Sequence, residues 1–166
     1  MAGFQTVVNT YPEAGVPGQE VTATNAVYSP YNYISDGTAE AGAFAYKGSV
    51  TDAATAQEYA VATKTGTGTT DLIGFVGRDV IASLNDPLNE GTNIYPVGVG
   101  LNIAERGAFY AQAAADIESE GVYVLVNDGT VTYGSSGDTG DTGWIVRFVQ
   151  GKSSASSGDI VIYEKA

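Results

Sequence analysis

The chain of 166 residues contains no cysteine and no histidine. Without cysteine it can form neither a disulfide nor a thiolate site. The absence of histidine removes the commonest general base, the usual zinc ligand and every catalytic triad that contains histidine. These two absences argue against most hydrolase and metalloenzyme chemistry, and we expect no catalytic residue, no metal and no cofactor.

Basic residues are also scarce. Seven Lys and Arg residues face 19 Asp and Glu residues, which gives a formal net charge of −12. Such a surface repels phosphate backbones and anionic lipids, because binding to both depends on Lys and Arg. The first residues lack the basic and apolar regions of a signal peptide, and no apolar run approaches the ~20 residues that span a bilayer. We therefore expect a soluble protein with no nucleic-acid partner and no membrane association.

Glycine and tyrosine are plentiful instead, with 22 and 11 residues, and 43% of the chain is hydrophobic. This composition favours an all-β protein with many tight turns over a helical bundle. The length is that of one domain with a real core.

Alternation of apolar and small or polar residues is strongest in the second half of the chain. Apolar positions that repeat every second residue predict strands with one buried face. Asn127-Asp128-Gly129 predicts the turn of a β-hairpin between two such runs. The alternating runs are VGVGLNIA (97–104), VYVLV (122–126), TVTYG (130–134), WIVRF (144–148) and IVIY (160–163).

The segment 103–117 fits two patterns. Its alanines favour a helix, whereas alternation of Phe109, Ala111 and Ala113 favours a strand. We favour a strand, a turn at Gly107 and a second strand.

The first half gives weaker signals. Strands are expected at 42–50, 58–64 and 72–80, and Pro12, Gly15, Pro17 and Gly18 interrupt any regular element before them. We therefore divide the chain into an extended N-terminal arm at 1–40 and a β-barrel or sandwich domain at 41–166.

Two groups of carboxylates are candidates for chemistry. Asp138 and Asp141 lie in the loop GSSGDTGDTG and could offer oxygens to a hard cation, but they fall short of a recognisable calcium loop. Asp116, Glu118 and Glu120 lie close enough for an acid–base pair, but no other motif supports a catalytic site. We favour a solvated loop and a surface turn, respectively.

The segment YSPYNY places Tyr28, Tyr31 and Tyr33 around Pro30. Tyrosine rings are amphipathic and are enriched at protein interfaces. They pack equally well over a domain's own core, so an interface and a lid both remain open here.

The order of motifs resembles the small structural cement, or decoration, proteins of tailed-phage capsids. The similar segments are FQTVVN and TYPEAGVPGQ at the start, GFVGR at 74–78, GVGLNIAERGAFYAQ followed by ESEGVYVLVNDGTVT, and the closing GWIVRFVQGKSSASSGDIVIYE. The resemblance implies a β module made in the host cytoplasm that sits on the outer capsid surface of the virion. It also implies a homo-dimer or homo-trimer that binds the major capsid protein, cements neighbouring capsomers and stabilises the shell without catalysis.

The resemblance gives the arm a role, because an extended segment can add a strand to the sheet edge of a neighbouring subunit. The expected contact residues lie in the arm and the tyrosine segment. They are Phe4, Val7, Val8, Tyr11, Pro12, Tyr28, Tyr31 and Tyr33.

Two other functions compete with this one. A carbohydrate- or receptor-binding module would stack exposed rings on sugars, with Tyr95 and Trp144 as further candidates, although Trp144 alternates with Val146 and Phe148 and is expected in the core. A hydrolase or lyase would need a carboxylate with a strongly raised pKa in a cleft.

Overall fold

The computed structural model describes residues 15–21, 25–48, 60–66, 69–78 and 93–166. All regular elements in these residues are β-strands, which confirms the all-β expectation. The strands are β1 (Val27–Tyr28), β2 (Tyr33–Ser35), β3 (Phe44–Lys47), β4 (Ala60–Thr63), β5 (Leu72–Val76), β6 (Gly100–Leu101), β7 (Ile103–Gln112), β8 (Tyr123–Asn127), β9 (Thr130–Gly134), β10 (Asp141–Arg147) and β11 (Ile160–Lys165).

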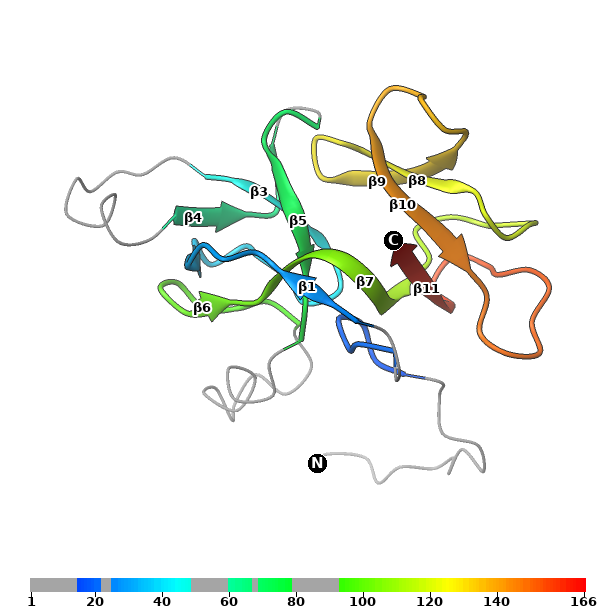
Figure 1. The fold of residues 1–166 in the computed structure, drawn as a ribbon, viewed down its shortest axis with the longest axis horizontal. Helices are drawn as coiled ribbons and strands as arrows, with labels where there is room; N and C mark the ends of the chain where they lie inside the picture. The colour runs from blue at the N-terminus through cyan, green and yellow to red at the C-terminus, as the bar shows by residue number, and fades with distance from the viewer. Residues whose placement is uncertain (1–14, 22–24, 49–59, 67–68, 79–92) are drawn as a thin grey trace, which may run out of the picture.

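These strands form one open sheet of 11 strands, which curves into a single domain resembling a sandwich or barrel. Its order is β6-β2-β4-β3-β5-β7-β11-β10-β8-β9, and β1 pairs with β7 outside this path. In Figure 1 β3, β4 and β6 lie on the left and β8 to β11 on the right, with β1, β5 and β7 between them. The chain is therefore organised around β7.

β7 joins the two parts of the sheet, because it pairs with a strand of each. Its first residues, Ile103 and Ala104, pair with β5, whereas 107–112 pair with β11. Gly107 lies between these regions at φ +123°, a backbone conformation open to glycine. The predicted turn at Gly107 is wrong: the glycine lets the strand change its pairing partner without ending it.

The other edge of β7 is occupied by the N-terminal segment. The Gly18 amide donates to the Tyr110 carbonyl at 2.8 Å, and the Tyr110 amide donates to the Gln19 carbonyl at 2.9 Å. The Val21 amide then donates to the Ala108 carbonyl at 2.9 Å, and β1 continues along the same strand. Residues 18–21 and β1 thus pair antiparallel with this edge of β7.

Pro17 and Gly18 fix the start of this segment. The Arg78 amide donates to the Gly18 carbonyl at 2.7 Å, and a Cβ on Gly18 would lie 2.8 Å from the Gly42 nitrogen. Further along, β2 lies inside the sheet between β6 and β4. Of the arm predicted at 1–40, residues 1–14 and 22–24 lie outside the described residues.

Aromatic rings fill the main hydrophobic core. The Phe75 ring centroid lies 5.4 Å from that of Phe44, 5.5 Å from that of Phe109 and 5.6 Å from that of Trp144. The Tyr163 ring lies 5.9 Å from Phe75. Trp144 is 1% exposed, so its predicted place in the core is confirmed.

A second buried cluster lies on the other face of β7's first residues. Ile103 belongs to this cluster and the next residue, Ala104, to the aromatic core, because successive side chains of a strand point to opposite faces. The buried members of this second cluster are Ala39, Ala41, Ala45, Ala62, Val76, Tyr95, Leu101 and Ile103.

The predicted strands differ in how well they match. β8 and β9 form the predicted hairpin, in which Asn127 pairs with Thr130 and both Asp128 and Gly129 have positive φ. β3, β4 and β5 lie within their predicted ranges, whose outer residues 49–50, 58–59 and 79–80 lie outside the described part. The strand predicted from Val97 is wrong at its start: Val97 and Gly98 form a turn, Gly98 has φ +80°, and pairing begins at Gly100.

Candidate capsid-contact site

Tyr28 covers the core with one side of its ring and leaves the other in solvent. The Phe109 ring centroid lies 6.1 Å away in an edge-on arrangement, yet 42% of Tyr28 is exposed. Its hydroxyl donates to a Glu20 carboxylate oxygen at 3.4 Å. The pKa of Tyr28 lies above its ordinary value, mainly because the ring is partly buried and also because of the nearby Glu20 carboxylate.

Tyr31 projects further from the surface, with 69% of its area exposed. Its ring meets that of Tyr33 edge-on at 6.4 Å, and Tyr33 is half-buried at the start of β2. Val27, in β1, is 48% exposed. The structure therefore combines the two hypotheses: Tyr28 partly lids the core, while Tyr31 is free to contact another molecule.

An open groove of about 690 Å³ adjoins this tyrosine segment. Tyr33 forms part of its lining, and Gly98 and Gly100 leave it open, because neither has a side chain and a Cβ on either would meet nothing within 4 Å. The remaining lining residues are Asn32, Ile34, Leu101 and Asn102.

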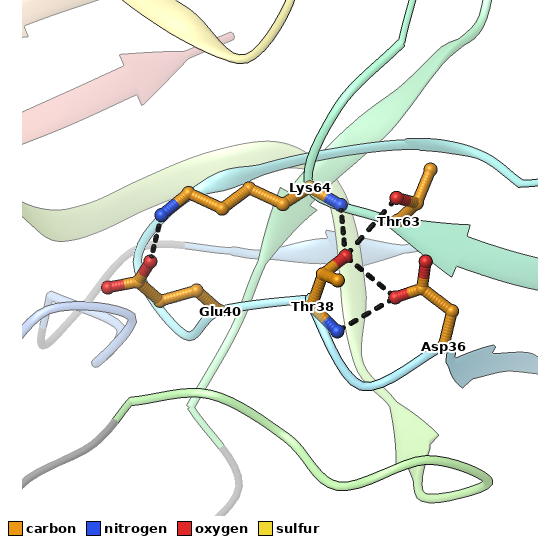
Figure 2. Close-up of polar contacts among 5 residues, drawn as sticks. All are labelled: Asp36, Thr38, Glu40, Thr63 and Lys64. Carbon is orange, nitrogen blue, oxygen red and sulfur yellow. Dashed lines mark hydrogen bonds and ion pairs between the residues drawn. The ribbon is translucent and has the colours of Figure 1, made fainter.

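A polar network fixes the loop between β2 and β3, as Figure 2 shows. One Asp36 oxygen accepts hydrogen bonds from the Thr38 amide at 2.8 Å and hydroxyl at 2.7 Å. The Lys64 amide donates to the Thr38 hydroxyl, which lies 3.2 Å from that of Thr63. Lys64 Nζ lies 2.6 Å from a Glu40 oxygen. These contacts attach the loop to the end of β4 and support the adjoining β2.

Asp138 and Asp141 bind backbone amides. Asp138 accepts a hydrogen bond from the Ser135 amide at 2.7 Å, and Asp141 accepts from those of Gly137 and Gly143 at 2.8 Å each. Within the described part of the chain, no group of three or more His, Cys, Asp or Glu residues could hold a metal ion. The carboxylates shape an exposed, hydrogen-bonded loop.

The second carboxylate group is likewise engaged in the fold. Asp116 accepts a hydrogen bond from the Ser157 amide at 2.9 Å, and Glu120 accepts one from the Phe148 amide at 2.7 Å. Glu118 is exposed. Asp116 and Glu120 therefore fix neighbouring turns.

The two further rings considered for sugar stacking, those of Trp144 and Tyr95, are not exposed as Tyr31 is. Trp144 and Tyr95 are buried, at 1% and 4% exposure. The Tyr95 hydroxyl donates to the Gly77 carbonyl at 3.1 Å. Neither ring presents a face to solvent.

Among the described residues, sequence reasoning missed four exposed aliphatic residues, Val16, Val27, Ile94 and Val97, of which Val97 is 76% exposed. Pro96 and Gly98 around Val97 are typical turn residues and could have indicated its exposure. The predicted arm contacts Phe4, Val7, Val8, Tyr11 and Pro12 lie outside the described residues.

Comparison with protein families supplies the decisive observation. The family model described as "Structural cement protein (E217 gp24/Pam3 gp6)" matches residues 4–165. The chain belongs to this family. It is a structural cement protein of the phage virion, located on the capsid, which it stabilises.

Among solved structures, this cement protein is similar to a chain in "The capsid of Myoviridae Phage XM1", with a TM-score of 0.59 and 15% sequence identity. The match covers 99% of this chain and 97% of that chain, so the two share a fold over nearly their whole lengths. No curated protein sequence matches the chain. In the described residues, no helix is long and apolar enough to cross a membrane.

Proposed function

We propose that this cement protein sits on the outer surface of the capsid, binds the major capsid protein and bridges neighbouring capsomers as a homo-oligomer. Its contacts are the tyrosine segment, with Tyr28, Tyr31 and Tyr33, and the N-terminal residues that precede Gly15. The protein acts by adding contacts between other subunits and transforms no molecule.

The exposure of Tyr31 beside Val27 and Tyr28 carries this proposal. Tyr31, Val27 and Tyr28 expose 69%, 48% and 42% of their area, whereas Phe44, Phe75, Phe109 and Trp144 are buried in the aromatic core. Tyrosine supplies a large apolar area and a hydroxyl at a small cost in side-chain entropy, which suits a contact with a second protein.

The N-terminal residues extend this contact. Phe4, Val7, Val8, Tyr11 and Pro12 precede a segment that is held firmly along β7, so whatever they bind becomes linked to the sheet. Ordering such residues costs about 1–2 kcal/mol each in backbone entropy, and the contact must therefore be extensive. Repetition around a shell offsets this cost, because an oligomer engages several capsomers at once.

Cosedimentation with expanded capsids tests the tyrosine contact. We expect Tyr31→Ala to weaken binding about tenfold, in line with the loss of an aromatic interface anchor. Val97→Ala removes an equally exposed apolar side chain at the other end of β2 and serves as the matched control. Equal binding of wild type and Tyr31→Ala would contradict the proposed contact.

A truncation that removes residues 1–14 tests the N-terminal contact separately. The remaining chain retains every backbone pair between residues 18–21 and β7, so we expect an unchanged fold and weaker capsid binding. Unchanged binding by this variant would restrict the contact to the tyrosine segment. Failure of the full chain to cosediment would overturn the proposed function as a whole.

A further inference from the structure

β9 is one of the two ends of the open sheet. It pairs with β8 over five residues, from Thr130 to Gly134, and no described residue pairs with its other edge. Its sequence TVTYG has no charge and no proline. Natural edge strands usually carry lysine, proline or a bulge that prevents pairing with another chain. β9 has no such protection.

The hydrogen bonds of β8 reveal which groups of β9 face outward. The Val126 amide donates to the Gly140 carbonyl at 2.8 Å, and the Val124 carbonyl accepts from the Thr142 hydroxyl at 2.8 Å. Both groups point away from β9. In an antiparallel pair, two opposite residues either direct their backbone groups toward each other, as a hydrogen-bonded pair, or both direct them away from each other. Val131 and Tyr133, which lie opposite Val126 and Val124, therefore direct their backbone groups to the open edge.

These outward groups are arranged symmetrically about Thr132. Two copies of β9 placed antiparallel with Thr132 opposite Thr132 would set Val131 of each copy against Tyr133 of the other. All outward amides and carbonyls of these residues would then be paired. Threonines opposite each other also form a favourable cross-strand pair. The edge is thus complementary to itself.

Charge restricts where a second copy can approach. Each copy carries a net charge of −12, so close approach is favoured at a surface free of acidic side chains. β9 itself carries no acidic side chain: Asp128 lies at the turn before it, and the Asp138 carboxylate lies beside Gly134 at its other end, where a Cβ would be 2.6 Å from the Asp138 Oδ2. Thr130 and Thr132 are exposed and leave the edge open on that face.

We infer that two copies of this cement protein pair through β9 in an antiparallel arrangement with a two-fold axis at Thr132. This inference deepens the proposed homo-oligomer by assigning its interface. A pair of five-residue strands buries less than the ~800 Å² per partner typical of a stable complex. The dimer is therefore weak in solution and becomes stable when the shell holds both copies.

A single engineered cysteine tests the two-fold axis, since the natural chain has none. In Thr132→Cys the paired Cα atoms would lie about 4.5 Å apart, within the range that a disulfide spans. In Thr130→Cys, the matched control on the same face, they would be offset by about 13 Å along the strand, too far to bridge. We expect Thr132→Cys to form covalent dimers at least about tenfold faster than Thr130→Cys, in solution and on capsids.

Charge exchange at the same position tests the pairing without oxidation. Thr132→Lys and Thr132→Glu each place like charges opposite each other, which is destabilising. We expect each variant alone to sediment as a monomer at concentrations where wild type dimerises, and an equimolar mixture to recover the dimer.

Equal cross-linking of the two cysteine variants, or no recovery in the mixture, would overturn the inference. Loss of capsid binding in Thr132→Lys without cross-linking in Thr132→Cys would mean that another chain pairs with β9, and would overturn it too. Retained capsid binding in either case would leave the proposed function standing.

Discussion

The two parts of the sheet on either side of β7 are built differently. On the C-terminal side, β7, β10 and β11 have 10, 7 and 6 residues, and the hairpin strands β8 and β9 have five each. On the N-terminal side, β1 and β6 have two residues each and β2 has three. β2 also pairs in parallel with β4, which requires a crossover connection.

The two buried clusters also differ, although β3 and β5 contribute Phe44 and Phe75 to the aromatic core. Trp144, Phe75 and Phe109 give the aromatic core large rings, whereas four of the eight buried residues of the second cluster are alanines. Stabilisation by burial grows with apolar area, so the aromatic core contributes more per residue. The aromatic core, to which Phe75 of β5 and Trp144 of β10 both belong, is therefore the main support, and the N-terminal segment that carries Tyr31 is a surface that this support holds in place.

The largest expected effect is a loss of the aromatic core. Trp144→Ala should lower the free energy of unfolding by about 3–5 kcal/mol, because the ring is fully buried among other rings. Leu101→Ala, in the second cluster, should cost about 2 kcal/mol, at the low end for a buried leucine.

Denaturant unfolding of both variants gives the comparison directly. Tyr31→Ala serves as an exposed aromatic control and should leave the midpoint unchanged. A smaller loss for Trp144→Ala than for Leu101→Ala would reverse the assignment of support and supported surface.

The next effect concerns the N-terminal segment along β7. Removing residues 1–21 deletes the backbone hydrogen bonds of Gly18, Gln19 and Val21 to β7, as well as that of Gly18 to Arg78. At about 0.5–1 kcal/mol each, the lower part of the usual range, the loss of these four bonds should destabilise the protein by about 2–4 kcal/mol. Removal of residues 1–14 should leave the stability unchanged. Thermal unfolding of the two truncated proteins measures this difference. Equal stability would show that the pairing along β7 contributes nothing.

The same contrast explains what the sequence could predict of the fold. β8, β9, β10 and β11 pair within two hairpins or with one long strand, and one buried face gives each a period of two residues. The N-terminal strands are short and find partners far away in sequence, so alternation is too brief to show their bounds. The Gly107 turn was predicted from local preference, but a tertiary demand, pairing with both β5 and β11, keeps that region extended.

The candidate site was predictable to a similar degree. Tyr31 follows from the clustering of three tyrosines around Pro30, which local sequence marks as interface candidates, although Tyr28 and Tyr33 lie in β1 and β2. The exposure of Val27 depends on β1 pairing with a strand about 80 residues away, near Arg106. The open edge at Thr132 depends on β9 ending the sheet order, which is a property of the whole topology. Neither could be read from local pattern.

Gly107 sharpens the comparison at the point where the two sides meet. A Cβ there would lie 2.9 Å from the Ala26 Cα, at a φ of +123° that other residues avoid. Gly107→Ala should therefore cost about 2 kcal/mol. Gly100→Ala, where a Cβ meets nothing within 4 Å, is the matched control and should be neutral or slightly stabilising. Equal melting temperatures for the two variants would mean that the bend in β7 imposes no strain.

The smallest expected effect is electrostatic and confined to the N-terminal side. Burial raises the pKa of Asp36, but hydrogen bonds from Thr38, Thr63 and the backbone of Asp36 together outweigh it, so the pKa lies below its ordinary value. A carboxyl group with a lowered pKa in the folded state stabilises the protein above its unfolded pKa of about 3.9 and loses that contribution as pH falls through the folded value.

Asp36→Asn should accordingly cost about 1 kcal/mol or less at pH 7, and the difference from wild type should vanish in acid. Denaturant unfolding at pH 7 and in acid checks the direction of this pH dependence. Asp71→Asn is the control, because Asp71 is also half-buried and lies on the N-terminal side of the sheet. If the stability difference between wild type and Asp36→Asn persists in acid, the charge of Asp36 is not its cause. Asp36 would then stabilise the loop through the hydrogen-bond geometry of its side chain. The loop that supports Tyr31 would then be fixed by hydrogen-bond geometry alone, as the C-terminal turns at Asp138 and Asp141 are by their backbone amides.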